Sequence, residues 1–150
     1  MPCLVIVPCG KRKIWDINPN AGPTPAKDTY QGPLFKACRA YAEKLAKTKG
    51  CHWIILSAKY GFIDPNFIIP ENYNVTFNDP STNPITIQEL RRQVKEKGLD
   101  KYTEIIALGG QQYLSRIKQA FPDKEVKAPF EGLPLGIMLK KIKEEVSRDP

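Results

Sequence analysis

The sequence predicts a three-layer α/β domain, in which a mainly parallel sheet of about four strands has helices on both faces. Strand-like and helix-like segments alternate along the chain, which is the pattern of parallel strands joined by helical crossovers. The strand-like segments are apolar throughout, as strands buried on both faces are. The 150 residues suit one domain with its own core, and no shift in composition marks a boundary.

The first half of the chain contains two predicted strands with a helix between them. Residues 3–8 form an apolar strand, and residues 9–32 form a turn-rich stretch with several prolines. Pro33 suits the first position of a helix, because its missing amide hydrogen would have no partner there. Apolar residues then recur every three or four positions until Gly50, which ends the helix. Residues 52–56 are the second strand.

The segment 61–84 departs from this alternation. Its prolines and asparagines make it too polar and broken for a regular element. We therefore expect a long irregular loop, of the kind that acts as a lid or a binding loop. After it, Thr86 and Glu89 form a capping box that opens a basic helix, and Gly98 ends that helix.

The last third of the chain returns to the strand-and-helix pattern. Residues 104–108 form a third buried strand, and residues 109–110 turn the chain into a helix over 111–121. A short strand over 125–128 and a final helix from Leu135 complete the order. The whole pattern predicts a Rossmann-like open sheet.

The charge balance favours polyanionic partners. Lys and Arg number 23 against 16 Asp and Glu, which gives a formal net charge of +7 and an isoelectric point near 9.2. Such an excess favours a nucleotide or nucleic acid, because phosphate contacts release counterions. A lysine-rich, solvated surface explains the same numbers. No apolar run reaches the roughly 18 residues of a membrane span and no signal peptide is visible, so we expect a cytoplasmic protein that does not enter a membrane.

The cysteines and the single histidine do not follow a metal-binding pattern. Cys3, Cys9, Cys38 and Cys51 include no Cys-x-x-Cys pair, and His52 lies within a strand, whereas zinc sites use tight ligand pairs. We expect no metal and no cofactor. Cys3 and Cys51 suit the core of neighbouring strands and Cys38 suits a buried helix position, while Cys9 falls where the first strand ends.

Polar segments follow the predicted strands. Right-handed crossovers bring the carboxyl ends of parallel strands to one edge, where open α/β sheets bind ligands. We therefore expect four segments to meet there, namely residues 9–13, 57–61, 109–113 and 130–133. The long loops add Asp28, Tyr30, Asp64, Glu71 and Tyr73. Together these segments predict a cleft with ammonium groups, carboxylates, phenols and exposed backbone.

Three residues are candidates for catalysis: Lys59, Asp28 and Glu131. Lys59 can hold a phosphate or stabilise developing negative charge, although an ordinary surface lysine fits the same position. Asp28 and Glu131 are the carboxylates best placed for acid–base or nucleophilic work on a glycosidic bond. Glu131 fits equally well as a charge at the start of a helix.

The remaining candidates are binding residues. Gly10 and Lys11 offer an amide and an ammonium group to a phosphate, although a turn with a solvated lysine is an equal reading. Ser57 is assigned a hydrogen-bonding role rather than a nucleophilic one, because no base accompanies it in a known pattern. Gly109 and Gly110, directly before a predicted helix, form either an anion site at the helix start or simply a tight turn. The full set is Cys9, Gly10, Lys11, Tyr30, Ser57, Tyr60, Gly61, Tyr73, Gly109, Gly110 and Tyr113.

Cys9 and the tyrosines each have a second reading. Lys11 and Lys13 favour a thiolate at Cys9, but nothing supplies a general base, so we assign Cys9 to binding. Tyr30, Tyr73 and Tyr113 can stack on a base, although packing in the core explains each of these tyrosines equally well.

Four ordered motifs span nearly the whole chain. They are Cys9-Gly-Lys11, Asp28-Thr-Tyr30-Gln-Gly32-Pro-Leu-Phe35, Leu56-Ser-Ala-Lys-Tyr-Gly61 and Glu131-Gly-Leu-Pro-Leu-Gly136. In this order they resemble a family of short uncharacterised prokaryotic and phage domains. The chain is more distantly similar to the YaaA peroxide-stress proteins, but it has Gln112 where that family has a late glutamate, and it shows no helix-hairpin-helix signature. The resemblance implies nucleic-acid-linked biology, including base modification.

Two functions of different classes fit these residues. The first is an enzyme that acts on a nucleotide or a nucleic-acid base by N-glycosidic or base-modification chemistry, with lysines on the phosphate and tyrosines on the base. The alternative is a non-catalytic nucleic-acid-binding or stress-response module, in which basic helix residues contact phosphate. Those helix residues are Arg91, Arg92, Lys95 and Lys97. A structural subunit of a larger modification complex is a third reading, and the oligomeric state is left open.

Overall fold

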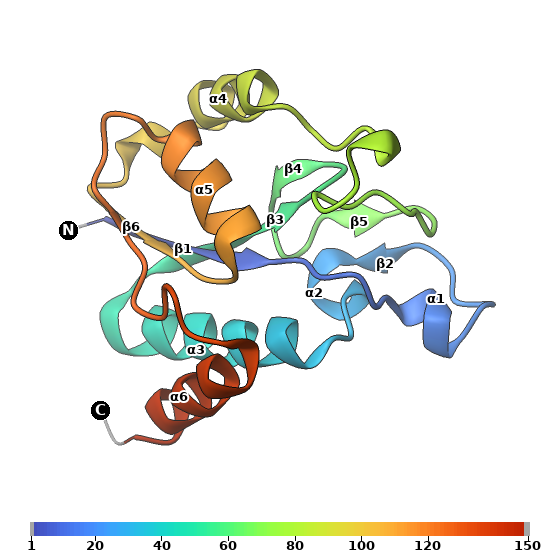
Figure 1. Ribbon diagram of the computed structural model, residues 1–150, viewed down its shortest axis with the longest axis horizontal. Coiled ribbons are helices and arrows are strands. Elements are labelled where there is room, and N and C mark those ends of the chain that lie inside the picture. The colour runs from blue at the N-terminus through green and yellow to red at the C-terminus, as the bar shows by residue number, and fades with distance from the viewer. Residues whose placement is uncertain (1, 149–150) are drawn as a thin grey trace.

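The computed structural model describes residues 2–148 and has a five-stranded sheet at its centre, in the order β4-β3-β1-β6-β7 (Figure 1). Four of these strands run parallel, and β4 pairs with β3 in the antiparallel direction at one edge. The prediction of a mainly parallel α/β sheet is therefore confirmed. The strands are β1 (Cys3–Pro8), β3 (His52–Ser57), β4 (Gly61–Ile63), β6 (Glu104–Ala107) and β7 (Val126–Lys127).

Helices form a layer on each side of the sheet (Figure 1). α3 (Pro33–Lys49) and α6 (Leu135–Ser147) lie on one side, with α6 packed against α3. α4 (Ile87–Glu96) and α5 (Gln111–Ala120) lie on the other side. The predicted helix ends are confirmed, since Pro33 begins α3 and the left-handed Gly50, with a φ of 70°, follows its last turn.

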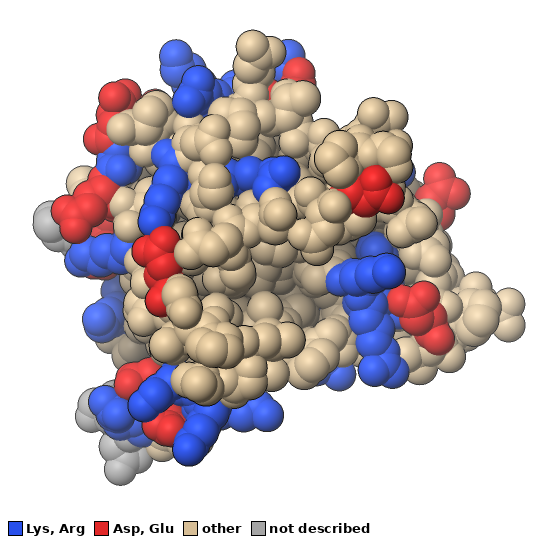
Figure 2. Space-filling view, viewed as in Figure 1, with Lys and Arg blue, Asp and Glu red and all other residues tan. Residues whose placement is uncertain are grey.

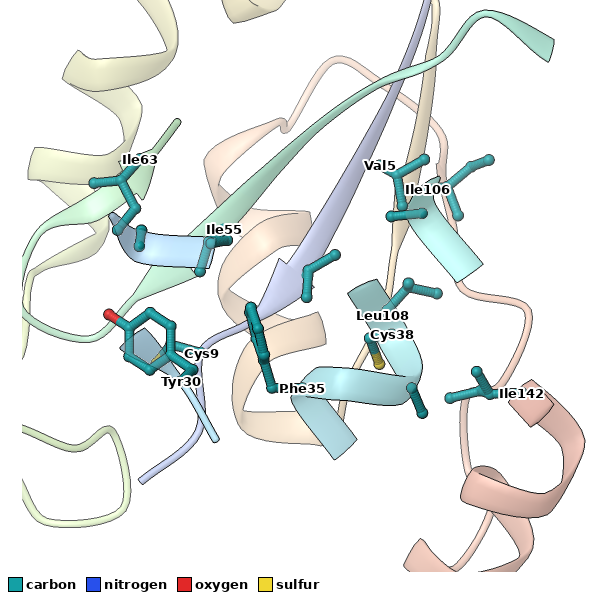
Figure 3. Packing of buried hydrophobic residues seen from close by; sticks show 14 of the residues in the cluster. Val5, Cys9, Tyr30, Phe35, Cys38, Ile55, Ile63, Ile106, Leu108 and Ile142 are labelled. Atoms are coloured by element: carbon teal, nitrogen blue, oxygen red, sulfur yellow. The ribbon is translucent and has the colours of Figure 1, made fainter. Parts of the chain in front are cut away.

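The core is divided by β1, which is buried along its whole length because it is apolar on both faces. Leu4 belongs to the hydrophobic cluster under α4 and α5, and its neighbour Val5 belongs to the cluster under α3 and α6. Figure 3 shows the second cluster, in which Phe35 and Cys38 of α3 and Ile142 of α6 point toward the sheet. β1 therefore holds a fixed position between two packed layers.

The helical connections that follow β1 and β6 lie on opposite faces of the sheet. The helix α3 leads from β1 to β3 on one side, whereas α5 leads from β6 to β7 on the other side. The order of the parallel strands therefore reverses between β1 and β6. Doubly wound sheets bind their ligands outside the carboxyl ends of the strands at such a switch point.

The prediction of a wholly irregular segment over residues 61–84 is wrong. It contains β4, a second short strand β5 (Ile68–Ile69) and a single 3₁₀ turn, η1 (Pro80–Thr82). Phe62 and Ile63 of β4 are buried against their neighbours, and a tight turn after β3 brings them back onto the sheet. The prediction failed because residues 61–84 are polar on the whole, so the short apolar stretch that forms β4 was not recognised.

The turn-rich stretch 9–32 also contains regular structure. It forms α1 (Ile14–Ile17), β2 (Thr24–Pro25) and α2 (Ala26–Thr29). β2 pairs with β5 in a separate two-stranded sheet, so the two longest connections of the fold support one another (Figure 1). A second 3₁₀ turn, η2 (Leu99–Lys101), precedes β6.

The four cysteines have two different roles. Cys3 of β1 and Cys51, directly before the neighbouring strand β3, are buried as expected, and they are also joined by a disulfide bond with their Cα atoms 4.6 Å apart. Cys9 and Cys38 are buried free thiols. Within residues 2–148, no group of three or more His, Cys, Asp or Glu side chains could hold a metal ion. Every helix in the same range is too short or too polar to cross a bilayer.

Candidate functional site

The candidate site lies outside the carboxyl ends of β1 and β6, at the switch point of the sheet. Figure 2 shows a hollow near the centre of the molecular face, and Figure 1 shows that this region lies between α3 and the N-terminal end of α5. Uncharged side chains line most of the hollow, and Lys and Arg side chains border it on the side of α1 (Figure 2). We call this hollow the crevice.

The segment after β1 contacts α5 across the switch point. The Cys9 amide donates to the Leu56 carbonyl at 3.2 Å, which continues the pairing of β1 with β3. The Cys9 Sγ atom lies 3.3 Å from the phenol oxygen of Tyr113, and the Gly10 amide donates to the same oxygen at 3.3 Å. Gly10 has a φ of 84° and no atom within 4 Å of an added Cβ, so there is space for a ligand beside it.

The turn after β3 is built around Ser57. The buried Ser57 Oγ accepts hydrogen bonds from the amides of Lys59 at 3.2 Å and Tyr60 at 3.1 Å. Gly61 follows with a φ of 76°, and an added Cβ there would lie 2.2 Å from Oε1 of Gln93. Gln93 also donates to the Tyr60 carbonyl at 2.9 Å. These contacts fix the direction in which Lys59 leaves the sheet.

Behind this turn lies a network of three buried hydroxyls. The phenol oxygens of Tyr30 and Tyr73 are 2.5 Å apart, and the Ser57 hydroxyl lies 3.0 Å from that of Tyr73. Tyr30, Ser57 and Tyr73 are 1%, 0% and 9% exposed. Burial raises the pKa of both phenols, so they remain neutral. Two of the predicted base-binding tyrosines therefore offer little free ring surface.

Two lysines from different segments approach the ring of Tyr73. The exposed Lys59 has its Nζ 5.5 Å from the Tyr73 ring centroid and 5.3 Å from that of Tyr60. The Nζ of Lys13 lies 4.3 Å from the Tyr73 ring centroid, and this side chain, unlike that of Lys59, is buried. Lys11 is exposed, which both a phosphate-binding role and a solvated turn allow. Sequence reasoning did not select Lys13, because a lysine within a run of basic residues reads as solvated.

The glycines before α5 differ in their surroundings. Gly109 is buried with a φ of 116°, and an added Cβ would lie 3.0 Å from the Pro8 ring, so the ends of β6 and β1 need glycine to come this close. Gly110 is exposed and precedes the first turn of α5. The tight-turn reading therefore explains Gly109, while Gly110 leaves the helix start accessible.

Glu131 brings the fourth predicted segment to the same region. Its carboxylate accepts a hydrogen bond from Lys118 at 2.8 Å and another from Gln111, at the start of α5, at 3.4 Å. The contacts with Lys118 and Gln111 hold the pKa of Glu131 below its usual range, so the group is an ionised carboxylate at neutral pH.

In the described part of the chain, the three other predicted carboxylates, Asp28, Asp64 and Glu71, form no ion pair with the side chains around Glu131. Asp28 is half-exposed on α2 and forms an ion pair of 3.6 Å with Arg39 of α3. Asp64 lines a separate groove of about 670 Å³ at the amino end of β3, together with His52 and Lys97. Glu71 is exposed. Glu131 is therefore hydrogen-bonded to α5, which follows one of the converging segments. Asp28 pairs instead with Arg39 of α3, outside the four converging segments.

The thiol of Cys9 is neutral at rest. Burial raises its pKa, and the contacts with Tyr113, with nearby backbone amides and with Lys13 oppose that rise only in part. Burial likewise raises the pKa of Tyr113. An activated thiolate, the second reading of Cys9, finds no support in these surroundings.

Comparisons with known proteins identify relatives but no activity. A model described as "Family of unknown function (DUF6884)" matches residues 4–144. The chain is 47% identical over 115 residues to the uncharacterised protein YfjM of Bacillus subtilis (strain 168), a match that covers 77% of this chain and 74% of the relative. No solved structure matches the chain.

Proposed function

The chain belongs to the DUF6884 family of unknown function, and we propose that it binds a nucleotide or a nucleic-acid base in the crevice and acts on it. The observation that carries the proposal is the set of contacts around the switch point of the sheet: Cys9 contacts Tyr113 of α5 and the Leu56 carbonyl next to Ser57. Glu131 joins the same helix through Gln111. Ligands of doubly wound sheets bind at this point.

Groups suited to phosphate lie beside the crevice. Lys11 and Lys59 are exposed, Gly110 is exposed before α5, and the space where a Gly10 Cβ would lie is empty, although the Gly10 amide itself donates to Tyr113. Backbone amides next to lysines form concave anion sites in many phosphate-binding proteins. The net charge of +7 attracts such ligands at long range.

For the base, the half-buried rings of Tyr60 and Tyr113 are better suited than those of Tyr30 and Tyr73. Aromatic rings stack on bases through their faces, so some ring surface must be accessible. In this proposal the buried pair supports the turn that carries Tyr60 and Lys59. Tyr60 also packs edge-on against Tyr73, with the ring centroids 5.5 Å apart.

For the chemistry we assign Glu131 as base or nucleophile and Lys59 as the group that stabilises developing charge. Glu131 is ionised, which suits attack on an N-glycosidic bond better than proton donation does. Asp28 stays a weaker candidate, because Glu131 contacts Gln111 at the start of α5, whereas Asp28 pairs with Arg39 of α3. The similarity to YaaA proteins and a cytoplasmic location belong to the same proposal.

The alternative, a non-catalytic nucleic-acid-binding or stress-response module, has less support from α4. Arg92 pairs with Glu89 and with Glu96, while Arg91 donates to the Gln119 carbonyl at 2.9 Å. Lys97 donates to the Phe62 carbonyl at the edge of the sheet. Basic side chains with these local partners are less free to contact phosphate. Lys95 is exposed and remains available.

The test is a thermal-shift and titration screen with nucleosides, nucleotides and short single strands, followed by chromatography for a released base. Ligand-linked stabilisation is about 2.7 kcal/mol at a hundred times the dissociation constant, so even weak ligands are detectable. We expect Lys59→Ala to weaken binding and Glu131→Gln to abolish turnover while binding persists. Lys95→Ala is the matched control, since it removes another exposed lysine, from α4.

Two results separate the hypotheses. A saturable site for a free nucleoside or nucleotide that depends on Lys59 supports the enzyme. Binding only to long strands, with a steep salt dependence and equal losses from Lys59→Ala and Lys95→Ala, supports the module instead.

A further inference from the structure

Lys13 is a buried ammonium group without a carboxylate partner. Its side chain is 4% exposed, and its Nζ donates one hydrogen bond, to the Lys11 carbonyl at 3.1 Å. Within residues 2–148, no carboxylate oxygen lies within 4.0 Å of this nitrogen. The carboxylate nearest in sequence, Asp16, instead accepts from the Lys13 backbone amide at 2.8 Å.

A buried ammonium group in this state is costly. Removing a charge from water costs several kcal/mol unless hydrogen bonds and an opposite charge replace the lost hydration. Lys13 has one hydrogen bond and the face of the Tyr73 ring, 4.3 Å from its centroid. Burial accordingly lowers the pKa of Lys13. A bound anion would supply the missing partner.

The segment that leads to Lys13 leaves space for such an anion. Gly10 has a left-handed φ of 84°, and the space where a Cβ would lie holds no atom within 4 Å. Lys11 and Arg12, between Gly10 and Lys13, are exposed. Figure 2 shows Lys and Arg side chains between the crevice and the region of α1, the helix that follows Lys13. Lys13 is also close enough to Cys9, at the end of β1, for each charge to affect the other.

We propose that residues Gly10–Lys13 bind a terminal phosphate monoester, with Lys13 as the buried cation of that subsite. This inference rests on the proposed function and names its ligand class: a mononucleotide or the phosphorylated end of a strand. A terminal monoester carries nearly two charges at neutral pH and presents three free oxygens. An internal phosphodiester carries one charge and has chain on both sides, so it offers an unpaired ammonium group less charge and fewer free oxygens than a terminal monoester does.

The first test compares ligands on the unaltered protein. Calorimetric titration is run with a nucleoside, its 5′-monophosphate, inorganic phosphate, and one oligonucleotide with and without a 5′-phosphate. We expect the phosphate group to strengthen binding about tenfold to a hundredfold, the effect of hydrogen bonds to a charged group. Inorganic phosphate should compete. The two oligonucleotides show whether a strand end or only a free mononucleotide enters.

The second test uses Lys13→Met, which keeps the length of the side chain and removes its charge. The free energy of unfolding should hold steady or rise, because a buried charge is replaced by an apolar group. The advantage of the 5′-monophosphate over the nucleoside should disappear. Lys124→Met, which alters a half-buried lysine beyond α5, should leave that advantage unchanged. Should Lys13→Met fail to fold, the ligand series on the unaltered protein still decides the phosphate requirement.

The outcomes separate this inference from the proposed function. Equal binding of nucleoside and monophosphate overturns the phosphate subsite and leaves the proposed function standing. A phosphate preference that survives in folded Lys13→Met overturns the role of Lys13. Absence of binding by every ligand overturns both.

Discussion

The hydroxyl of Ser57 lies 3.0 Å from the phenol oxygen of Tyr73, sixteen residues further along the chain. The phenol oxygen of Tyr30 lies 2.5 Å from the same oxygen, so each of the three buried hydroxyls has a hydrogen-bond partner within the group. Such a network is stabilising while every member has a partner and costly when one partner is removed. It ties the turn that carries Lys59 to both long connections of the fold.

Tyr73→Phe should therefore destabilise the protein by about 1–3 kcal/mol, the cost of leaving buried hydroxyls unpaired. Urea unfolding measures the change. Tyr41→Phe is the control, because Tyr41 is half-buried against Phe130 and outside the network. We expect that control to stay within about 0.5 kcal/mol of the unaltered protein. Equal stability of the two variants would show that the network contributes nothing.

Gly61→Ala should cost more than Gly10→Ala, although both positions have a left-handed backbone. The conformational strain of about 1–2 kcal/mol is common to both substitutions. At Gly61 the new Cβ would also lie 2.2 Å from Oε1 of Gln93, whereas at Gly10 it meets no atom within 4 Å. Chemical denaturation of the pair isolates the steric contribution. A larger loss at Gly10 would contradict the close packing of the turn after β3.

The stability of the protein should fall at alkaline pH, in part because of Cys38. Burial raises the pKa of this thiol from 9.0 to about 12. The unfolded chain loses the proton first, so the contribution is complete below about pH 9 and is lost as the pH rises toward about 12. The slope within that window is about 1.4 kcal/mol per pH unit for one thiol.

Cys38→Ala isolates this contribution, since the other buried thiol and the phenols titrate in both proteins. Unfolding free energies at about pH 8.5 and 10.5 should converge for the two proteins as the pH rises. Parallel curves at the two pH values would mean that Cys38 ionises as readily in the folded protein as in the unfolded one.

The Cys3–Cys51 bond should stabilise the protein by about 2–4 kcal/mol, mainly through the unfolded chain. Treatment with a reductant should raise the number of titratable thiols under denaturing conditions from two to four and lower the unfolding midpoint. The double variant Cys3→Ala/Cys51→Ala should show the lower midpoint without any response to the reductant. If the reductant also lowered the unfolding midpoint of the double variant, the loss of stability would come from a group other than this disulfide bond.

Thiol counting on protein taken from a reducing cytoplasm also bears on the proposed location. Cytoplasmic proteins rarely keep disulfide bonds, so the cytoplasmic proposal expects four free thiols in the cell. A bond between Cys3 and Cys51 that persists in freshly prepared lysate would count against that location.

Local chemistry determined much of the fold directly from the sequence. The apolar run of residues 3–8 needs burial on both faces, Pro33 and Gly50 bound a helix by their backbone preferences, and the Thr86 hydroxyl caps the amide of Glu89 at 3.1 Å. The position of polar residues directly after strands also predicted which segments meet, because parallel strands end at one edge.

Only the tertiary structure decided how those segments are used. Whether Tyr73 is an open stacking surface or a buried hydrogen-bond partner depends on contacts with Ser57 and Tyr30, which no local pattern encodes. The same holds for Lys13, which belongs to a basic run in the sequence yet is buried beside an aromatic ring. Residue type and spacing fix local conformation and hydrophobic burial, whereas the environment of a polar side chain depends on neighbours that are distant in the chain.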